Sequence, residues 1–286
     1  MMRPTIGIIG AGKVGCALAR LLSEAGYTIG AASSQSSASA GSLAETVGAA
    51  QVESSVEVAR QVDLILLTVP DDRIEAVSAE IAQADLSGKG VVHTSGAHDA
   101  HSLKTAADRG GWVGSLHPAF PFADCEQSVR NLPGATFAVE AADTILQAWL
   151  LDIVAALKGH PLLLPAGSKA LYHAALVLVS NYTVTLYATA ENLLLGLGAD
   201  RAAADAALSA LLEATAVNIR QQGIPQALTG PLVRSDTGTI AAHVFALAQV
   251  DEQLTQTYLH LARLSLPLLT ARGLPTAAIE RQLGET

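Results

Sequence analysis

Two side chains that could move a proton lie one helical turn apart in the middle of the chain. Lys169 and His173 are separated by four residues, which places them on one face of a helix. Such a pair could supply a proton, or a positive charge, to an oxygen atom that becomes negative during a reaction. The sequence leaves open a plainer alternative, in which the lysine is solvated at a helix start and the histidine is a hydrogen-bonded core residue.

Two further polar residues follow predicted strands, where a ligand usually binds in an α/β protein. Ser95 lies in the run H-T-S-G-A and could donate a hydrogen bond to a ligand. His117 lies in the run S-L-H-P and either faces the same pocket or only stabilises its turn. We expect both residues, with Lys169 and His173, to form a catalytic group.

A fourth polar run lies in the last third of the chain and could bind a carboxylate. Arg234 is the candidate clamp, because a guanidinium group binds a carboxylate through two hydrogen bonds. The alternatives are an ion pair between Arg234 and Asp236, and a role for Asp236 as the N-cap of the following helix. The residues predicted to bind substrate are Asn181, Thr229, Arg234 and Asp236.

A glycine motif near the amino terminus predicts a dinucleotide site. The run G-A-G-K-V-G stands between a short apolar strand and an amphipathic helix. Its first glycine permits a tight turn, its second lets a pyrophosphate approach the backbone, and its third lets the helix pack closely on the strand. The first amide groups of the helix would then face the phosphates. The motif residues predicted to bind the dinucleotide are Gly10, Ala11, Gly12, Lys13, Val14 and Gly15.

The residues after the second predicted strand favour NADP(H) over NAD(H). A protein that binds NAD usually has an acidic residue there, which holds the 2′-hydroxyl of the ribose. This chain has Ser33 and Ser34, whose hydroxyls could donate to a 2′-phosphate, although the arginine that usually accompanies that phosphate is missing from the loop. Val69 and Pro70, after a buried strand, are expected beside the nicotinamide ribose or, equally well, in an ordinary turn.

The elements that must position these residues divide the chain into two predicted domains. Residues 1–164 alternate strands with helices, which indicates a doubly wound, mostly parallel sheet of the Rossmann type. Residues 165–286 show no convincing strand and predict a helical domain for substrate binding and dimerisation. The expected strands are 6–9, 27–32, 63–69, 90–93, 112–116, 135–139 and 162–164. The expected helices are 13–25, 72–84, 100–109, 142–157, 168–197, 199–222, 237–248 and 251–272, with a short one after Pro275.

Composition narrows the classes of partner. The net charge of −9 argues against nucleic acid but allows a small carboxylate substrate bound by a local arginine. Cys16 and Cys125 lie far apart without C-x-x-C spacing, so we expect no disulfide, no metal site and a reducing compartment. Without a signal peptide or a long apolar stretch, the chain is expected to be cytoplasmic and not to bind a membrane. Helices rich in leucine and alanine predict a homodimer.

Together these motifs resemble a family of oxidoreductases that join a Rossmann-like domain to a helical C-terminal domain of unknown function. The resemblance rests on the glycine motif, T-S-G-A, S-L-H-P, K-x-x-Y-H-A-A with S-N, and L-T-G-P-x-x-R-x-D, and it covers essentially the whole chain. That family is similar to pyrroline-5-carboxylate reductase, ketopantoate reductase and the β-hydroxyacid dehydrogenases. In the last group a helix-borne lysine assists proton transfer, with an asparagine four residues later, where this chain has His173.

The resemblance and the residues predict an enzyme that reduces a C=O bond of a small oxo acid with a nicotinamide cofactor. Lys169 would assist the proton transfer and Arg234 would anchor the carboxylate. The alternatives are an imine (C=N) reductase of the pyrroline-5-carboxylate reductase type and an NADPH sensor without catalysis. A metal site formed by His98 and His101 is not expected, because no third ligand is placed to complete it.

Overall fold

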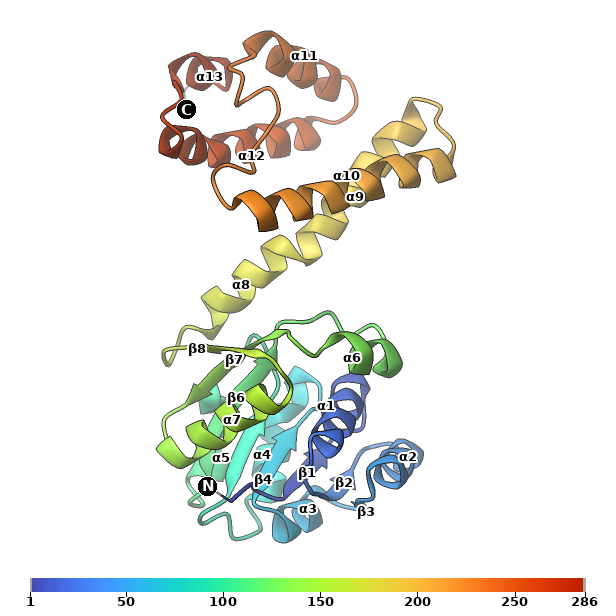
Figure 1. Ribbon diagram of the computed structural model, residues 1–286, viewed down its shortest axis with the longest axis vertical. Coiled ribbons are helices and arrows are strands. Elements are labelled where there is room, and N and C mark those ends of the chain that lie inside the picture. Colours follow the sequence, from blue (N-terminus) through green and yellow to red (C-terminus); the bar gives the residue numbers. More distant parts are fainter. Residues whose placement is uncertain (1, 285–286) are drawn as a thin grey trace. The chain divides into compact units, whose positions relative to one another are not determined.

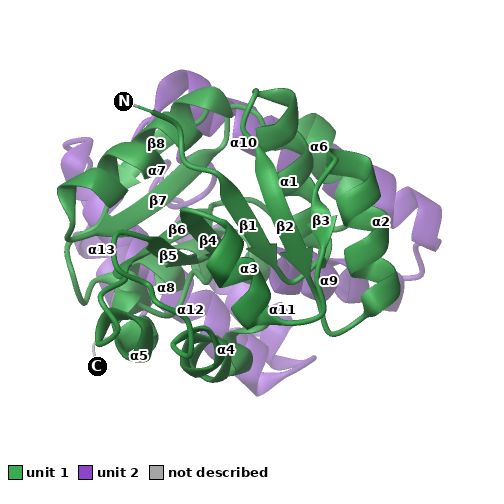
Figure 2. Cartoon of the chain, turned by 90° about the horizontal axis from the view of Figure 1, so that it is seen from below, with its two compact units in different colours: residues 1–183 green, residues 184–286 purple. Residues whose placement is uncertain are grey.

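The computed structural model describes residues 2–284 of the chain. They form two compact units that divide between Thr183 and Val184, which Figure 2 colours green and purple. The division falls inside a helix. The first unit includes the helix that begins at Lys169, so Ser95, His117, Lys169 and His173 all belong to one unit.

A single eight-stranded sheet forms the centre of the first unit (Figure 1). Its strand order is β3-β2-β1-β4-β5-β6-β7-β8, and only the β6–β7 pair is antiparallel. The parallel strand order with crossovers confirms the predicted doubly wound Rossmann-like sheet. The strands are β1 (Ile6–Ile9), β2 (Ile29–Ser33), β3 (Ala50–Gln51), β4 (Leu64–Leu67), β5 (Gly90–His93), β6 (Trp112–Pro118), β7 (Thr136–Ala141) and β8 (His160–Leu163).

Helices cover both faces of this sheet, as the view of Figure 2 shows, and bury its apolar strands. One face packs against α1, α2, α6 and α7, and the other packs against α3, α4 and α5. The central strand β4, L-I-L-L, is fully buried because it has a layer of helices on each side. The helices are α1 (Lys13–Glu24), α2 (Ser37–Val47), α3 (Ser55–Gln61), α4 (Ile74–Ile81), α5 (Lys104–Ala107), α6 (Cys125–Asn131), α7 (Thr144–Ala156) and α8 (Lys169–Val179), with 3-10 turns η1 (Asp71–Arg73) and η2 (Ala100–Leu103).

Local sequence explains where several of these helices begin. Ser36, Ser54, Asp124 and Asp143 each precede a helix, and their side-chain oxygens accept hydrogen bonds from backbone amides of its first turn. Such caps satisfy amide groups that have no partner inside the helix. The serine-rich segment after β2, expected to be a cofactor loop, therefore continues into helix α2.

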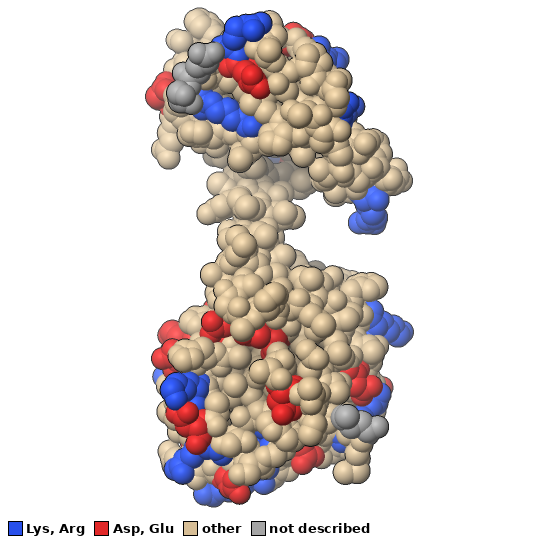
Figure 3. Space-filling view, turned by 90° about the vertical axis from the view of Figure 1, so that its left-hand side faces the viewer, with Lys and Arg blue, Asp and Glu red and all other residues tan. Residues whose placement is uncertain are grey.

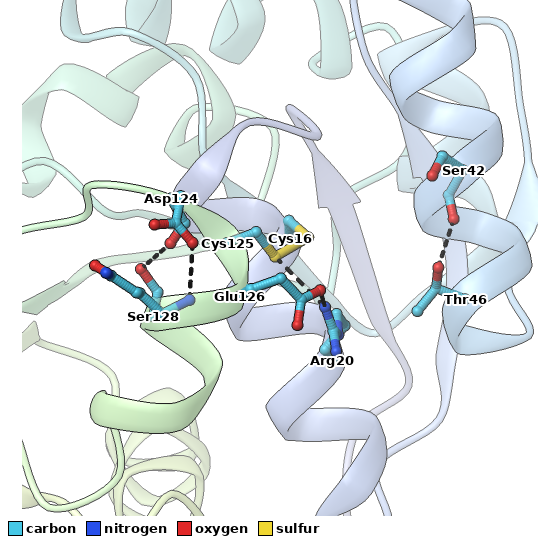
Figure 4. Close-up of a disulfide and its surroundings, with 9 residues drawn as sticks. Cys16, Arg20, Ser42, Thr46, Asp124, Cys125, Glu126 and Ser128 are labelled. Atoms are coloured by element: carbon cyan, nitrogen blue, oxygen red, sulfur yellow. Dashed lines mark hydrogen bonds and ion pairs between the residues drawn. A yellow bond between two sulfur atoms is a disulfide. The ribbon is translucent and has the colours of Figure 1, made fainter.

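The expectation that the two cysteines are unpaired is wrong. Cys16 of α1 and Cys125 of α6 form a disulfide with Cα atoms 6.0 Å apart, and Arg20 forms an ion pair with Glu126 beside it (Figure 4). The two cysteines are 109 residues apart and meet only because α6 packs on α1. Their spacing in the sequence therefore gave no sign of the pairing.

The second unit is helical, as expected. Its helices are α9 (Asn181–Gly196), whose first residues belong to the first unit, α10 (Arg201–Gln222), α11 (Thr237–Ala248), α12 (Glu252–Ala271) and α13 (Ala277–Gln282). Ile240, Leu269 and Ile279 are buried where α11, α12 and α13 pack together. Helix α9 has no buried residue, and α10 buries only Ala204.

Among the described residues, one helix, α10, has the length and apolar composition to cross a membrane. This finding is weak evidence for a membrane span, because core helices of soluble proteins and signal sequences satisfy the same criterion. Asp205 and Glu213 also interrupt its apolar residues, and carboxylates inside a bilayer are unfavourable.

Candidate functional site

A cavity of about 470 Å³ lies at the carboxyl ends of β1, β2 and β4. This is the edge of the sheet where doubly wound proteins bind nucleotides. Six residues predicted to bind the dinucleotide line it: Gly10, Gly12, Ser33, Ser34, Val69 and Pro70. Further lining residues that the sequence did not single out include Thr68, Ser54, Ser55, Arg73 and Glu80.

The three motif glycines have the geometry that a dinucleotide requires. Gly10 has a φ of +106°, and a side chain there would meet the backbone of Thr68, so the tight turn needs glycine. A Cβ atom at Gly15 would lie 2.0 Å from the carbonyl oxygen of Gly10, so this glycine allows α1 to approach β1. At Gly12 a Cβ atom would meet nothing within 4 Å. That open space beside the start of α1 fits a pyrophosphate held by backbone amides.

Thr68 holds the glycine turn in place from the neighbouring strand. Its hydroxyl donates a hydrogen bond of 2.6 Å to the carbonyl oxygen of Gly10 and lies 3.2 Å from that of Ile9. Thr68 is nearly buried and follows β4 directly. The turn is therefore fixed before any ligand binds.

The second part of the site is built around a buried lysine. Lys169 is 1% exposed, and its Nζ atom donates a hydrogen bond of 2.7 Å to the carbonyl oxygen of Ser95. Burial lowers the pKa of the ammonium group from 10.5 to about 8, although the charges of Glu140, Asp71 and Asp99 oppose the shift. A pKa near neutrality suits a group that exchanges protons. The solvated lysine that the sequence left open is thus excluded.

His117 and Tyr172 form a neutral hydrogen-bonded pair close to this lysine. Nδ1 of His117 lies 2.9 Å from the hydroxyl of Tyr172. Burial, with the charge of Lys169, lowers the pKa of His117 to about 4, and burial raises the pKa of Tyr172 to about 12. The tyrosine is therefore protonated and the imidazole is neutral at pH 7. In the tautomer in which Tyr172 donates to Nδ1, the Nε2–H group of His117 is left to donate elsewhere.

Gly96 brings the loop after β5 against both histidines of the site. A Cβ atom there would lie 2.7 Å from Cδ2 of His173 and 2.8 Å from Nε2 of His117. The rings of His117 and His173 have their centroids 6.3 Å apart. Three sequence motifs, T-S-G-A, S-L-H-P and K-x-x-Y-H, thus meet in one place.

The loop that carries Ser95 is held by a buried network. The amide of Ser95 donates to Nδ1 of His93, and Nε2–H of His93 donates to the carbonyl oxygen of Asp99 over 3.0 Å. The next amide, that of Ala100, donates to the carboxylate of Glu140, which the hydroxyl of Ser115 also approaches. Burial lowers the pKa of His93 to about 4 and raises the pKa of Glu140. The backbone carbonyl that receives Lys169 is thereby fixed.

The side chain of Ser95 has a different role from the predicted one. Its hydroxyl oxygen accepts hydrogen bonds from the amides of Ala97 and His98, at 3.2 and 3.1 Å, and the residue is buried. The hydroxyl therefore shapes the loop. It is the carbonyl group of Ser95, which sequence analysis did not consider, that contacts Lys169.

The predicted substrate-binding residues are spread over both units. Asn181 begins α9 within the first unit, and Thr229, Arg234 and Asp236 lie in the second. Asp236 is the N-cap of α11, since its carboxylate accepts hydrogen bonds from the amide and the hydroxyl of Thr239. Those bonds lower its pKa. Within residues 2–284, Arg234 is exposed and forms no ion pair within 4 Å, although its positive charge also helps to lower the pKa of Asp236.

Glu140, Tyr172 and Arg73 were not predicted from the sequence as site residues. Glu140 is the last residue but one of β7, and Tyr172 lies in the K-x-x-Y-H motif, where no role was predicted for it. Beside Glu140 lies a second cavity of about 400 Å³, whose lining includes Asp99, His101 and Lys104. Only the folded chain shows that Glu140, Tyr172 and Arg73 lie at the site.

Comparison with known families identifies both parts of the chain. Residues 1–118 match a Rossmann-like domain, and residues 135–265 match a domain of unknown function, DUF2520. No protein of curated function is significantly similar to the chain in sequence.

Solved structures share the fold over nearly the whole chain. A provisionally assigned NADP oxidoreductase from Bacteroides fragilis is 25% identical, covers 91% of this chain and 97% of its own, and has a TM-score of 0.71. A Thermotoga maritima protein is 22% identical with a TM-score of 0.78, covering 94% of this chain and 99% of its own. The NADP-bound pyrroline carboxylate reductase of Plasmodium falciparum is 15% identical with a TM-score of 0.59, and the match covers 100% of both chains. The last two similarities establish the fold alone. Over these ranges the chain thus resembles a Rossmann-like domain followed by a DUF2520 domain.

Proposed function

We propose that the protein is an oxidoreductase that uses NADPH to reduce a C=O bond of a small oxo acid. The observation that carries the proposal is the buried Lys169, whose pKa of about 8 lets it donate a proton near neutral pH. It lies in the same compact unit as the dinucleotide cavity. The similarity to the Bacteroides fragilis NADP oxidoreductase supports the choice of cofactor.

The cavity at the glycine turn would hold the cofactor. The amides at the start of α1 would bind its pyrophosphate, Ser33 and Ser34 its adenosine ribose, and Val69 and Pro70 its nicotinamide ribose. When bound, the reduced nicotinamide supplies a hydride to the carbonyl carbon of the substrate. Asp71, directly after Pro70, is close enough to raise the pKa of Lys169, so the strand end that borders the cavity also reaches the lysine site.

Lys169 would then act on the carbonyl oxygen. As the hydride arrives, this oxygen gains negative charge, which the ammonium group stabilises and neutralises by donating its proton. The Ser95 carbonyl is a neutral acceptor, so it fixes the position of Nζ without removing its proton, and the proton stays available for transfer. In the tautomer in which Tyr172 donates to Nδ1 of His117, the Nε2–H group would donate a second hydrogen bond to the same oxygen.

A carboxylate clamp at Arg234 stays a prediction from the sequence; the side chain is exposed and has no ion pair within 4 Å among the described residues. A planar guanidinium group binds a carboxylate through two parallel hydrogen bonds. Polar contacts of a substrate with Thr229 and Asn181 stay predictions of the same kind. Asp236 contributes indirectly, by fixing the start of α11 two residues after Arg234.

A titration followed by a substrate screen tests the proposal. NADPH and NADH are titrated by fluorescence, and loss of reduced cofactor is then followed with a panel of 2-oxo acids, 3-oxo acids and cyclic imines. Lys169→Met should lower turnover of an oxo acid roughly 100- to 10,000-fold while NADPH affinity holds. Lys158→Met, which changes an exposed lysine, is the matched control and should leave turnover unchanged. Unchanged turnover in Lys169→Met would remove the lysine from the mechanism.

A second candidate is imine reduction, because the Plasmodium falciparum pyrroline carboxylate reductase shares the fold. An imine substrate is usually protonated already, so its reduction needs Lys169 less. Turnover of cyclic imines, but of no oxo acid, with little effect of Lys169→Met would favour it. If the protein binds NADPH and consumes none with either class, it is a sensor of the nucleotide.

We further propose that the active protein is a homodimer formed through its apolar helices. Residues 170–190 contain no Asp, Glu, Lys or Arg, and Figure 3 shows no charged side chain over α8 on the face that it presents. Leu171 and Val179 of α8 are more than three-quarters exposed within one chain. Monomers rarely leave such a continuous apolar surface in water, and a second copy of the same helices would cover it. A cytoplasmic location, with no contact with membrane or nucleic acid, stays a prediction from the sequence.

A further inference from the structure

Arg73 is the cationic side chain that the dinucleotide cavity offers. Among the described residues that line it, Arg73 is the only lysine or arginine. The same cavity is lined by Ser33, Ser34 and Gln35 from the end of β2, where the 2′-position of a bound adenosine ribose lies. The turn η1 after β4 thus supplies the cavity with a cation that the loop after β2 lacks.

The topology allows Arg73 to serve this position. Strand β1 lies between β2 and β4, and neighbouring strands are about 4.8 Å apart, so the ends of β2 and β4 are about 10 Å apart. A bound nucleotide would fill this interval, and the side chain of Arg73 is long enough to extend into it. The side chain of Arg73 is about half exposed, so it is free to turn toward a ligand.

The other charged groups that line the cavity are acidic. They are Glu53 and Glu80. Nη2 of Arg73 lies 4.0 Å from Oε1 of Glu80, the outer limit of an ion pair, while Oε2 of Glu80 accepts a hydrogen bond of 3.0 Å from Ser55. Glu80 is thus held by a neutral partner, and the guanidinium is balanced only loosely. Without Arg73 the cavity would be purely acidic, which would repel a phosphate but not a hydroxyl group.

We propose that Arg73 selects NADPH over NADH by binding the 2′-phosphate, with Ser33 and Ser34 as further donors and Glu80 as the counter-ion of Arg73 when the site is empty. The inference rests on the proposed use of a nicotinamide dinucleotide. A guanidinium group forms two parallel hydrogen bonds with a phosphate, which the neutral 2′-hydroxyl of NADH does not offer. Binding of NADPH exchanges the loose Glu80 contact for this stronger one.

Calorimetric titration of the full chain with NADPH and NADH tests the inference. Arg73→Gln should weaken NADPH binding by about 10- to 100-fold and change NADH binding less than about twofold. Glu80→Gln should strengthen NADPH binding several-fold without affecting NADH, because it removes the competing partner and a repulsive charge. Arg60→Gln, which changes an exposed arginine outside the cavity, is the matched control and should alter neither affinity.

Two results overturn the inference while leaving the proposed function intact. One is an equal loss of both affinities in Arg73→Gln, which would mean that Arg73 contacts a part that the two nucleotides share. The other is an unchanged preference for NADPH. If the natural chain binds neither nucleotide, the proposed function itself fails. Adenosine 2′-monophosphate, titrated beside adenosine, separates recognition of the phosphate from every contact with nicotinamide.

Discussion

The ammonium group of Lys169 donates a 2.7 Å hydrogen bond to the carbonyl oxygen of Ser95, although 74 residues separate the two along the chain. This contact joins the first turn of α8 to the loop after β5. The lysine is buried there without a direct ion pair in the described part of the chain, which explains its lowered pKa. Its protonation therefore changes near pH 8, where that of a solvated lysine would not.

Turnover of the proposed reduction should fall as the pH rises through about 8. Lys169 must carry the proton that it donates, and its pKa of about 8 means that the protonated fraction drops about tenfold per pH unit above that value. The groups that bear on it are the carboxylates of Glu140, Asp71 and Asp99 and the imidazoles of His93 and His117, which are neutral above about pH 4. The pH dependence of kcat, measured with saturating NADPH, checks this.

Glu140→Gln should move this alkaline limit to lower pH. The carboxylate raises the pKa of Lys169, so its replacement by a neutral amide lets burial lower that pKa further. At pH 7 the variant should keep most of its activity, and at pH 8 it should lose more than the natural protein does. A uniform loss of activity at every pH would instead indicate that Glu140 only holds the loop at Ala100.

Gly96→Ala should impair turnover and leave NADPH binding nearly unchanged. The added methyl group would lie within 3 Å of both His117 and His173, so both rings must move away from their present positions. Because proton donors act over short distances, a shift of about 1 Å is expected to cost roughly 100-fold in turnover. Gly196→Ala is the matched control, since a methyl group there meets nothing within 4 Å. Full activity of Gly96→Ala would show that the histidines are not used.

The features of this site that could be predicted from the sequence are those that depend on residues close together in the chain. The glycine motif and the Lys169–His173 pair were found because a few consecutive residues encode a turn or one face of a helix. The same locality revealed the strand and helix alternation, whereas the short strand β3 and the helices α2, α3 and α6 lacked a clear apolar period.

The contributions of Arg73, Glu140 and the cysteine pair depend on contacts that the fold creates. Arg73 follows β4, and only the strand order brings it into the cavity that β2 borders. Glu140 faces the loop before η2 because β7 runs antiparallel to β6, a reversal that the sequence did not indicate. The number of residues between two positions in the sequence does not show whether the fold brings them into contact.

The chain should sediment as a dimer at micromolar concentration. Leu178→Glu and Val179→Lys each introduce a charge at an exposed apolar position of α8. Each should shift the protein toward monomer, because formation of the dimer would bury an unpaired charge at the interface. Arg60→Gln, far from the apolar helices in sequence, should leave the dimer intact. A natural chain that is monomeric throughout this range, or that partitions into detergent micelles or vesicles, would contradict the proposed second copy as the occupant of this surface.

Reduction of the Cys16–Cys125 disulfide should lower the free energy of unfolding. The bond closes a loop across 109 residues, and the loss of this restriction in the unfolded chain corresponds to about 3 to 5 kcal/mol by the chain-entropy argument. Urea denaturation with and without a thiol reductant measures the difference, and mass spectrometry after thiol alkylation shows whether the purified chain is oxidised. The double variant Cys16→Ser/Cys125→Ser should be as stable as the reduced protein, and the reductant should not change its stability. Equal stability of the natural chain in both redox states would show that α6 packs on α1 without the disulfide.

The disulfide also lies beside the glycine motif, because Cys16 directly follows Gly15. A fall in NADPH affinity on reduction would show that the bond fixes the start of α1.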